Sequence, residues 1–271
     1  MPHATPRDPR KPRASHYVRD RAEKEAGTSE LMRVKTALMS RGLSPRKRFG
    51  QNFLIQESLA ERIVEHAHLR EECGDVPRVT IVEGDFLEFD LAAAAAAHGV
   101  DRLVVVGNIP YNVTTPILEH VFASRRVVRS AVLLVQKEYA ERLAAAAGTP
   151  EYGSLTLFAR YHALMEPLMT IRSGAFWPRP DVDSMLVRFF LREHPPVDAP
   201  EALLFRIIRA SFQQRRKQLA NTLQNALGLP GPAVERLGRQ AGILLTRRGE
   251  TLTLDEFARL ARAAVDRGVD A

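Results

Sequence analysis

The stretch Gly107-Asn108-Ile109-Pro110-Tyr111-Asn112 constrains this chain most, because it directly follows the apolar run Leu103 to Val106. The run predicts a strand, and the stretch predicts a loop at its end. Pro110 has a fixed φ and biases the preceding residue toward an extended conformation, so the carbonyl before the proline can be aimed outward. With the Asn108 amide beside it and the Tyr111 ring behind, the loop could accept two hydrogen bonds from one exocyclic amine. The pattern favours a pocket for a nucleobase amine.

A plain strand-to-helix turn is the alternative for the same residues. In that case Asn108 would cap a helix that begins near Thr114 or Thr115, and Tyr111 would only pack.

A family resemblance rests on two motifs in the expected order. The stretch Asn108 to Tyr111 resembles the Asn-Pro/Leu/Ile-Pro-Tyr signature of amino-methyltransferases. Upstream, Lys47-Arg48-Phe49-Gly50-Gln51-Asn52-Phe53-Leu54 resembles the opening motif of the ribosomal RNA adenine dimethyltransferases. Further matches lie in the loop Gly174 to Ser184 and in Glu250 to Phe257, so the resemblance runs from about Leu31 to Ala263.

The resemblance implies an S-adenosylmethionine-dependent enzyme and assigns roles to individual residues. Asn52, Leu54 and Asn108 would contact the cofactor, and Asp85, which follows the predicted strand Val79 to Val82, would accept from its adenine amino group. Ligands of open α/β sheets do bind outside the carboxyl ends of the strands. Asn108, Pro110 and Tyr111 would hold the target base, with Phe176 facing Tyr111 across a flipped adenine.

Two structural alternatives stay open for these residues. Asn52 could cap a helix while Leu54 belongs to the core, and Phe176 could pack with Trp177 as ordinary apolar side chains.

Composition restricts the compartment and the partners. The chain has 271 residues, a formal charge of +7 and a single cysteine, Cys73. It can therefore form neither an intramolecular disulfide nor a multi-cysteine zinc site, and we expect no bound metal, a reducing environment and a cytoplasmic location. The longest run of small apolar residues, Leu91 to Ala97, is far shorter than a membrane span. The basic balance suits a polyanionic partner, although alone it is a weak signal.

The order of patterns predicts three regions. Residues 1–28 form a basic, disordered tail, residues 29–194 an α/β domain, and residues 195–271 a small all-α domain after a proline-rich linker. Helices are expected at about 58–72, 91–98, 113–123, 136–147, 152–163 and 201–227, and strands at 79–82, 103–106, 131–135, 168–171 and 185–191.

Basic side chains make the last region and the opening motif candidates for RNA binding. Family resemblance favours contacts from Arg46, Lys47 and Arg48 and from Arg215, Arg216 and Lys217, although a solvated face is the alternative. We expect a monomer that acts on small-subunit ribosomal RNA or a pre-ribosomal particle.

One expected part of a methyltransferase sheet is missing from the sequence. Its first strand, glycine-rich turn and ribose-binding acid have no counterpart, since no two of the 16 glycines are spaced as G-x-G. The fold expected is a Rossmann-like class I methyltransferase sheet without its first βαβ unit, with an internal deletion near residues 70–78 and bare hydrophobic strand edges. Cofactor binding and activity are therefore in doubt. A cofactor-deficient relative, an internally deleted gene and a faulty gene model all remain open.

Three functions follow from these patterns. The first is an adenine N6,N6-dimethyltransferase of small-subunit ribosomal RNA, and the second is an RNA-binding relative that assists ribosome assembly without catalysis. The third, a DNA adenine methyltransferase, fits worst because that family usually has proline at the position of Ile109.

Overall fold

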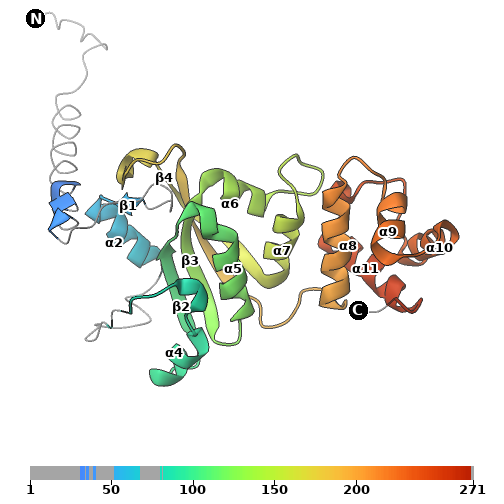
Figure 1. Cartoon of the computed structure of the whole chain (residues 1–271), viewed down its shortest axis with the longest axis horizontal. Coiled ribbons are helices and arrows are strands. Elements are labelled where there is room, and N and C mark those ends of the chain that lie inside the picture. The colour runs from blue at the N-terminus through green and yellow to red at the C-terminus, as the bar shows by residue number, and fades with distance from the viewer. Residues whose placement is uncertain are drawn as a thin grey trace, which may run out of the picture.

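A four-stranded sheet forms the centre of the first part of the fold (Figure 1). The computed structural model describes residues 31–33, 35–36, 39–40, 52–67, 80 and 82–269. The strand order is β2-β3-β6-β4, with bounds Leu103–Asn108, Val128–Gln136, Ser184–Leu191 and Ala163–Ile171 respectively. β2 runs parallel to β3, whereas β6 runs antiparallel to both β3 and β4. The sheet is therefore mixed, with one parallel pair.

Helices cover both faces of this sheet. Ala131 to Val135 in β3 is a continuous apolar run that is fully buried, as expected for a strand with cover on both sides. On one face pack α5 (Thr114–Ala123) and α6 (Lys137–Ala144). On the other lies α2 (Glu57–His66), which contributes Leu59 and Ile63 to a smaller cluster.

A second, two-stranded sheet lies beside α2. It pairs β1 (Phe53–Leu54) with β5 (Phe176–Trp177) in antiparallel register, so Leu54 is directly opposite Phe176. Ile55 extends the pairing by donating its N–H to the Ala175 carbonyl at 2.9 Å. This small sheet joins two segments that are more than a hundred residues apart.

The rest of the chain is helical. α7 (Ser154–His162) precedes β4, and after β6 come α8 (Glu201–Gln213), α9 (Leu219–Leu227), α10 (Gly231–Ala241) and α11 (Leu254–Val265). Tyr152, Leu157 and Tyr161, in or just before α7, are buried in the same core cluster as the four C-terminal helices. The C-terminal helices therefore pack on α7, as Figure 1 shows in orange and red.

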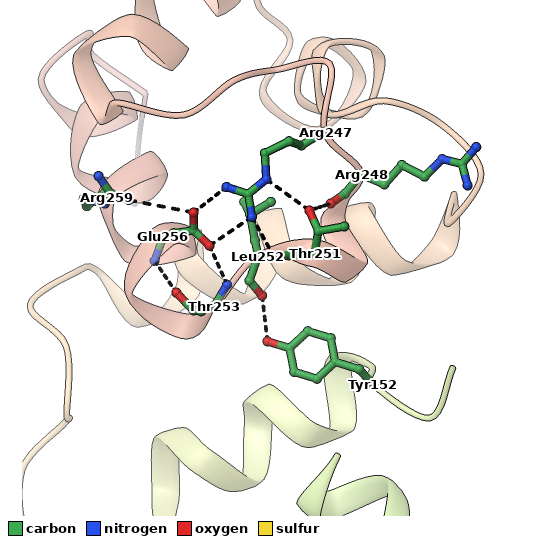
Figure 2. A network of polar contacts seen from close by, with 8 residues as sticks. All are labelled: Tyr152, Arg247, Arg248, Thr251, Leu252, Thr253, Glu256 and Arg259. Atoms are coloured by element: carbon green, nitrogen blue, oxygen red, sulfur yellow. Dashed lines mark hydrogen bonds and ion pairs between the residues drawn. The ribbon is translucent and has the colours of Figure 1, made fainter. Parts of the chain in front are cut away.

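A polar network fixes the turn before α11 (Figure 2). Thr253 and Glu256 form a capping box at the start of the helix, each side chain bonding the other residue's N–H. Arg247 donates to both carboxylate oxygens of Glu256, at 2.5 and 3.3 Å. Arg247 donation is the largest influence on the Glu256 carboxyl and holds its pKa below the ordinary value.

The buried Tyr152 hydroxyl connects this turn to the α/β part. It donates to the Leu252 carbonyl at 2.7 Å, and Figure 2 shows it reaching up from the segment before α7. Burial raises the pKa of Tyr152 to about 12, so the phenol keeps its proton and remains a donor at physiological pH.

Most of the expected elements are confirmed, with small shifts at their ends. Strands 103–106, 131–135, 168–171 and 185–191 all exist and are longer than expected. The helix expected at 91–98 is α4 (Leu91–Ala97), which begins at its Asp90 cap. The helix expected at 58–72 is described only as far as Ala67, and the tail 1–28 lies outside the described residues.

Two of the expected elements are wrong. The single helix 201–227 is divided into α8 and α9, because Arg215 to Lys217 offers no apolar side chain to bury and Leu219 instead donates to the Arg247 carbonyl. The strand 79–82 is contradicted at Thr80 and Val82, which are exposed and lie outside any strand. Val79 and Ile81 lie outside the described residues.

No helix in the described ranges is long and apolar enough to cross a membrane.

Candidate active site

The end of β2 delivers Asn108 to the carboxyl edge of the sheet. Asn108 is exposed and lies opposite Leu134 of the parallel strand β3. Pro110 has φ −63° and ψ 133°, and a short 3-10 turn, η3 (Tyr111–Val113), then leads into α5. Pro110 itself is therefore extended, and Asn108 makes no capping bond to α5.

A hydrogen bond joins the two sequence motifs. The Asn108 Nδ2 donates to the backbone carbonyl of Asn52 at 2.8 Å, although the two residues are 56 positions apart. A carbonyl only accepts hydrogen bonds, so the Asn108 atom that bonds the Asn52 carbonyl must be the side-chain nitrogen, Nδ2. The side-chain Oδ1 is thereby left for another donor, since no described residue bonds it. The opening motif and the Asn-Ile-Pro-Tyr loop thus meet at one edge of the sheet.

Tyr111 is held in place by its hydroxyl. Its oxygen lies 2.6 Å from the Ser184 Oγ at the first residue of β6. Burial is the largest influence on its pKa, which is raised above the usual value of a phenol. Ser184 ends the loop motif Gly174 to Ser184, which by itself predicts no role for it, and its contact with Tyr111 is seen only in the fold.

Phe176 lies in the core of the small cluster under α2. It is 3% exposed and packs with Leu134, Ile171 and Leu186. This arrangement matches ordinary packing, the alternative that the sequence left open, and Leu54 packs against the same cluster. A stacking role for Phe176 stays a prediction that requires its ring to become accessible.

Asp85 has a structural partner. Its Oδ1 accepts from the Leu87 N–H at 2.9 Å and caps the short helix η2 (Phe86–Glu88). Phe86 makes an edge contact with the His120 ring of α5, at 5.4 Å between centroids, which anchors the segment. Asp85 itself is exposed.

The basic candidates separate into three groups. Arg46, Lys47 and Arg48 lie outside the described residues. Arg215 folds back onto the protein: it donates to the carbonyls of Pro150 and Tyr152 and lies 5.8 Å from the centre of the Phe212 ring. Arg216 and Lys217 are exposed in the turn between α8 and α9.

No metal-binding constellation accompanies these residues. In the described segments, no three side chains among His, Cys, Asp and Glu come together as a cluster that could hold an ion. What the geometry offers is polar: an amide oxygen, a carbonyl next to a proline and an aromatic ring at the end of one strand.

Comparison with known proteins identifies the family. The sequence profile described as Ribosomal RNA adenine dimethylase matches residues 74–263, which is more than half of the chain. This chain belongs to the ribosomal RNA adenine dimethylase family. Ribosomal RNA small subunit methyltransferase A of Geobacillus sp. (strain WCH70) is 35% identical over 279 residues, covering 85% of this chain and 95% of that protein. The protein of the same name from Lysinibacillus sphaericus (strain C3-41) is 35% identical over 280 residues, covering 86% and 95%.

Solved structures support the fold of this family member. A dimethyladenosine transferase from Plasmodium falciparum has a TM-score of 0.58 at 19% identity, covering 77% of this chain and 80% of that one. The 23S rRNA methyltransferase ErmE has a TM-score of 0.51 at 21% identity, with coverages of 78% and 79%. The methyltransferase-type α/β fold with a helical C-terminal part is thereby confirmed.

Proposed function

We propose that this chain recognises an adenine of small-subunit ribosomal RNA and presents its amino group for N6 methylation. The hydrogen bond between Asn108 and Asn52 carries the proposal, because it unites the two motifs that the family resemblance rests on. The curated relatives cited above are named for the same class of substrate, which supports it. We infer a cytoplasmic location from this substrate.

The Asn108 side chain would be the main acceptor for the adenine amine. Its Nδ2 is committed to the Asn52 carbonyl, so its Oδ1 is the atom that remains to face an N–H donor. The carbonyl before Pro110 would take the second N–H, and the pair would draw the nitrogen lone pair out of conjugation with the ring. Tyr111, fixed by Ser184, would lie against the base. Methylation then depends on holding this amine in line with the donated methyl group.

The residues proposed to contact the cofactor form a less complete site than those proposed to hold the base. S-adenosylmethionine supplies the methyl group in this family, and Asn52, Leu54, Asp85 and Asn108 are the residues we propose for its contact. The Asn52 carbonyl already accepts a hydrogen bond from Asn108, and one carboxylate oxygen of Asp85 already accepts from the Leu87 N–H. The described residues offer neither a glycine turn nor a second acid placed to hold a ribose. The fit to the whole cofactor is therefore incomplete.

The lengths of the alignments support a missing unit. The alignment with the Geobacillus relative is 279 residues long, whereas 85% of this 271-residue chain is only about 230 residues. About 50 positions of that alignment thus have no counterpart here. The family profile begins its match at residue 74, next to the junction near 70–78 where the sequence predicts the loss. We propose that an internal βαβ unit is absent at this junction.

The RNA contacts would come chiefly from the turn between α8 and α9. Arg216 and Lys217 are exposed there, whereas Arg215 is bound to backbone carbonyls of its own chain. Exposed cations are suited to phosphate contacts, which position an RNA without reading its bases. Arg46, Lys47 and Arg48 remain candidates by family resemblance alone.

Replacing both exposed cations should weaken RNA binding without loss of fold. We expect R216A/K217A to reduce the slope of log affinity against log salt by about 1.4, because each lost phosphate contact removes ~0.7 for single-stranded RNA. The matched control is R236A/R239A, which removes two exposed arginines from α10. Filter binding to small-subunit ribosomal RNA at a series of salt concentrations measures both. Equal slopes for the two double variants would remove Arg216 and Lys217 from the RNA surface.

Methyl incorporation distinguishes the function from its alternatives. At high S-adenosylmethionine concentration, we expect labelled methyl groups on adenines of immature small subunits and none on duplex DNA. RNA binding without any incorporation would favour the assembly relative. Equal affinity for ribosomal RNA and duplex DNA at every salt concentration would contradict both RNA functions.

A further inference from the structure

We propose that a cavity between α6, α7 and α8 holds a guanine that flanks the target adenine in the RNA. The cavity has a volume of about 450 Å³, which is in the range of small-molecule sites. α7 contacts both α6 and α8, as Figure 1 shows. The charged and large apolar residues that line the cavity are Glu138, Arg142, Glu151, Leu155, Phe212 and Arg215. This subsite rests on the RNA function proposed above.

The wall formed by α6 is connected to the loop proposed to hold the base. Glu138 lies in the first turn of α6, which starts directly after β3 at the carboxyl edge of the sheet. The preceding Lys137 donates its N–H to the Asp183 carbonyl at 3.0 Å. The residue after Asp183 is Ser184, whose hydroxyl lies 2.6 Å from that of Tyr111. This wall of the cavity therefore starts at the edge that carries the base site.

The wall formed by the end of α8 is connected to the turn proposed for phosphate contacts. Arg215 donates to the carbonyls of Pro150 and Tyr152, which ties this end of α8 to the segment before α7. Arg216 and Lys217 follow directly and are exposed. An RNA strand that contacts this turn and reaches the base site therefore passes the cavity.

Two oppositely charged side chains line the cavity without a partner. Glu138 and Arg142 are exposed and four positions apart on α6, yet neither side chain makes a hydrogen bond or ion pair with a described residue. The neighbouring pair at the same spacing, Lys137 and Glu141, does form an ion pair, at 3.7 Å. An acid four positions before a base is the more favourable order on a helix, and Glu138 and Arg142 have that order. Both side chains are thus available to a ligand.

Guanine matches this pair of side chains better than the other RNA bases. Its N1–H and N2–H groups are adjacent donors for a carboxylate, and its O6 and N7 are adjacent acceptors for a guanidinium. The other bases lack the paired donors. Side chains four positions apart on a helix lie about 5–6 Å from one another, so Glu138 can meet the donor edge while Arg142 meets the acceptor edge. Leu155 and Phe212, both half-buried, offer apolar surface to the ring.

A phosphate group does not suit the same cavity. Glu138 and Glu151 both line it, and their negative charges repel a phosphate. The base is therefore the part of the nucleotide that enters, while the phosphates stay with the exposed Arg216 and Lys217 outside.

Fluorescence anisotropy with short RNA tests the subsite in the full chain. The probe is a labelled adenine decamer with one guanine at its centre, and its flanking adenines let the guanine reach the cavity in any register. We expect the all-adenine decamer to bind roughly tenfold more weakly, and E138Q/R142Q to bind the two decamers equally. K137Q/E141Q is the matched control: it removes one charge of each sign from neighbouring positions of α6, so it should keep the preference.

The same measurement separates the subsite from the RNA function. If the wild type shows no preference for the guanine decamer but still binds small-subunit ribosomal RNA, the subsite is overturned and the function stands. A preference that survives E138Q/R142Q would overturn the subsite as well. A chain that does not bind ribosomal RNA either would contradict both.

Base analogues test the individual contacts. Inosine lacks the N2 amino group and 7-deazaguanine lacks N7, so each analogue removes one proposed hydrogen bond. We expect inosine to weaken binding roughly fivefold in the wild type and R142Q but not in E138Q. In turn, 7-deazaguanine should weaken binding in the wild type and E138Q but not in R142Q. If each analogue has the same effect on the wild type and on both variants, Glu138 and Arg142 do not hold the base.

Discussion

Asn108→Ala should lower methyl transfer by roughly a hundredfold or more while leaving RNA affinity nearly unchanged. The substitution removes the Oδ1 that we propose for the adenine amine and the Nδ2 that holds the Asn52 carbonyl at 2.8 Å. It touches no phosphate contact, and phosphate contacts set most of the affinity for RNA. The measurement is label transfer to immature small subunits at high S-adenosylmethionine concentration, with RNA affinity measured in parallel.

Asn112→Ala is the matched control for this prediction. Asn112 is an exposed asparagine four positions along the same loop, in the turn η3, and it has no proposed role. We expect its variant to keep wild-type transfer. If Asn108→Ala lost RNA binding as well, the bond to Asn52 would be structural and the base site would lie elsewhere.

Glu256→Ala should have the largest effect on stability, about 3 kcal/mol. The side chain is only 18% exposed, accepts from Arg247 and completes the capping box of α11 with Thr253 (Figure 2). Its removal leaves the Arg247 guanidinium without a carboxylate in a partly buried position. Urea unfolding followed by circular dichroism measures the change. Glu235→Ala, on the exposed face of α10, is the control and should cost well below 1 kcal/mol.

The pH dependence of the Glu256 contribution has a definite sign. Because the folded pKa of Glu256 is lowered, the unfolded chain takes up a proton first as pH falls. The stabilisation is therefore complete above the ordinary carboxyl range, near 4.5, and is lost as pH falls through the folded pKa. The difference in unfolding free energy between wild type and Glu256→Ala should narrow in acid. A difference that stays constant down to pH 3 would show that the network contributes through packing alone.

Local chemistry made much of this fold predictable. The runs Leu103 to Val106 and Ala131 to Val135 are strands, as their continuous apolar composition predicts, and Asp90 marks the start of α4 by capping it. The same patterns could not locate the end of α8. There the chain leaves the helix at residues whose partners are distant in sequence: Leu219 donates to the Arg247 carbonyl, and Arg215 binds the carbonyls of Pro150 and Tyr152.

The candidate site was predictable in its residue types but not in its contacts. The motifs predicted that Asn52 and Asn108 share a site, whereas the bond between them depends on the position that β1 takes by pairing with β5. Phe176 shows the limit of the motif most clearly, since its burial under α2 comes from packing that no short pattern encodes.

Calorimetric titration of the full chain with S-adenosylmethionine tests the central claim, which is that the proposed cofactor site is less complete than the proposed base site. The loss that we propose, of the glycine turn and the ribose acid, would remove hydrogen bonds worth ~1.5–3 kcal/mol each, which corresponds to a hundredfold or greater loss of affinity. We predict no saturable binding at micromolar cofactor, together with retained binding of small-subunit ribosomal RNA. Micromolar binding of S-adenosylmethionine would contradict this account and establish a complete cofactor site.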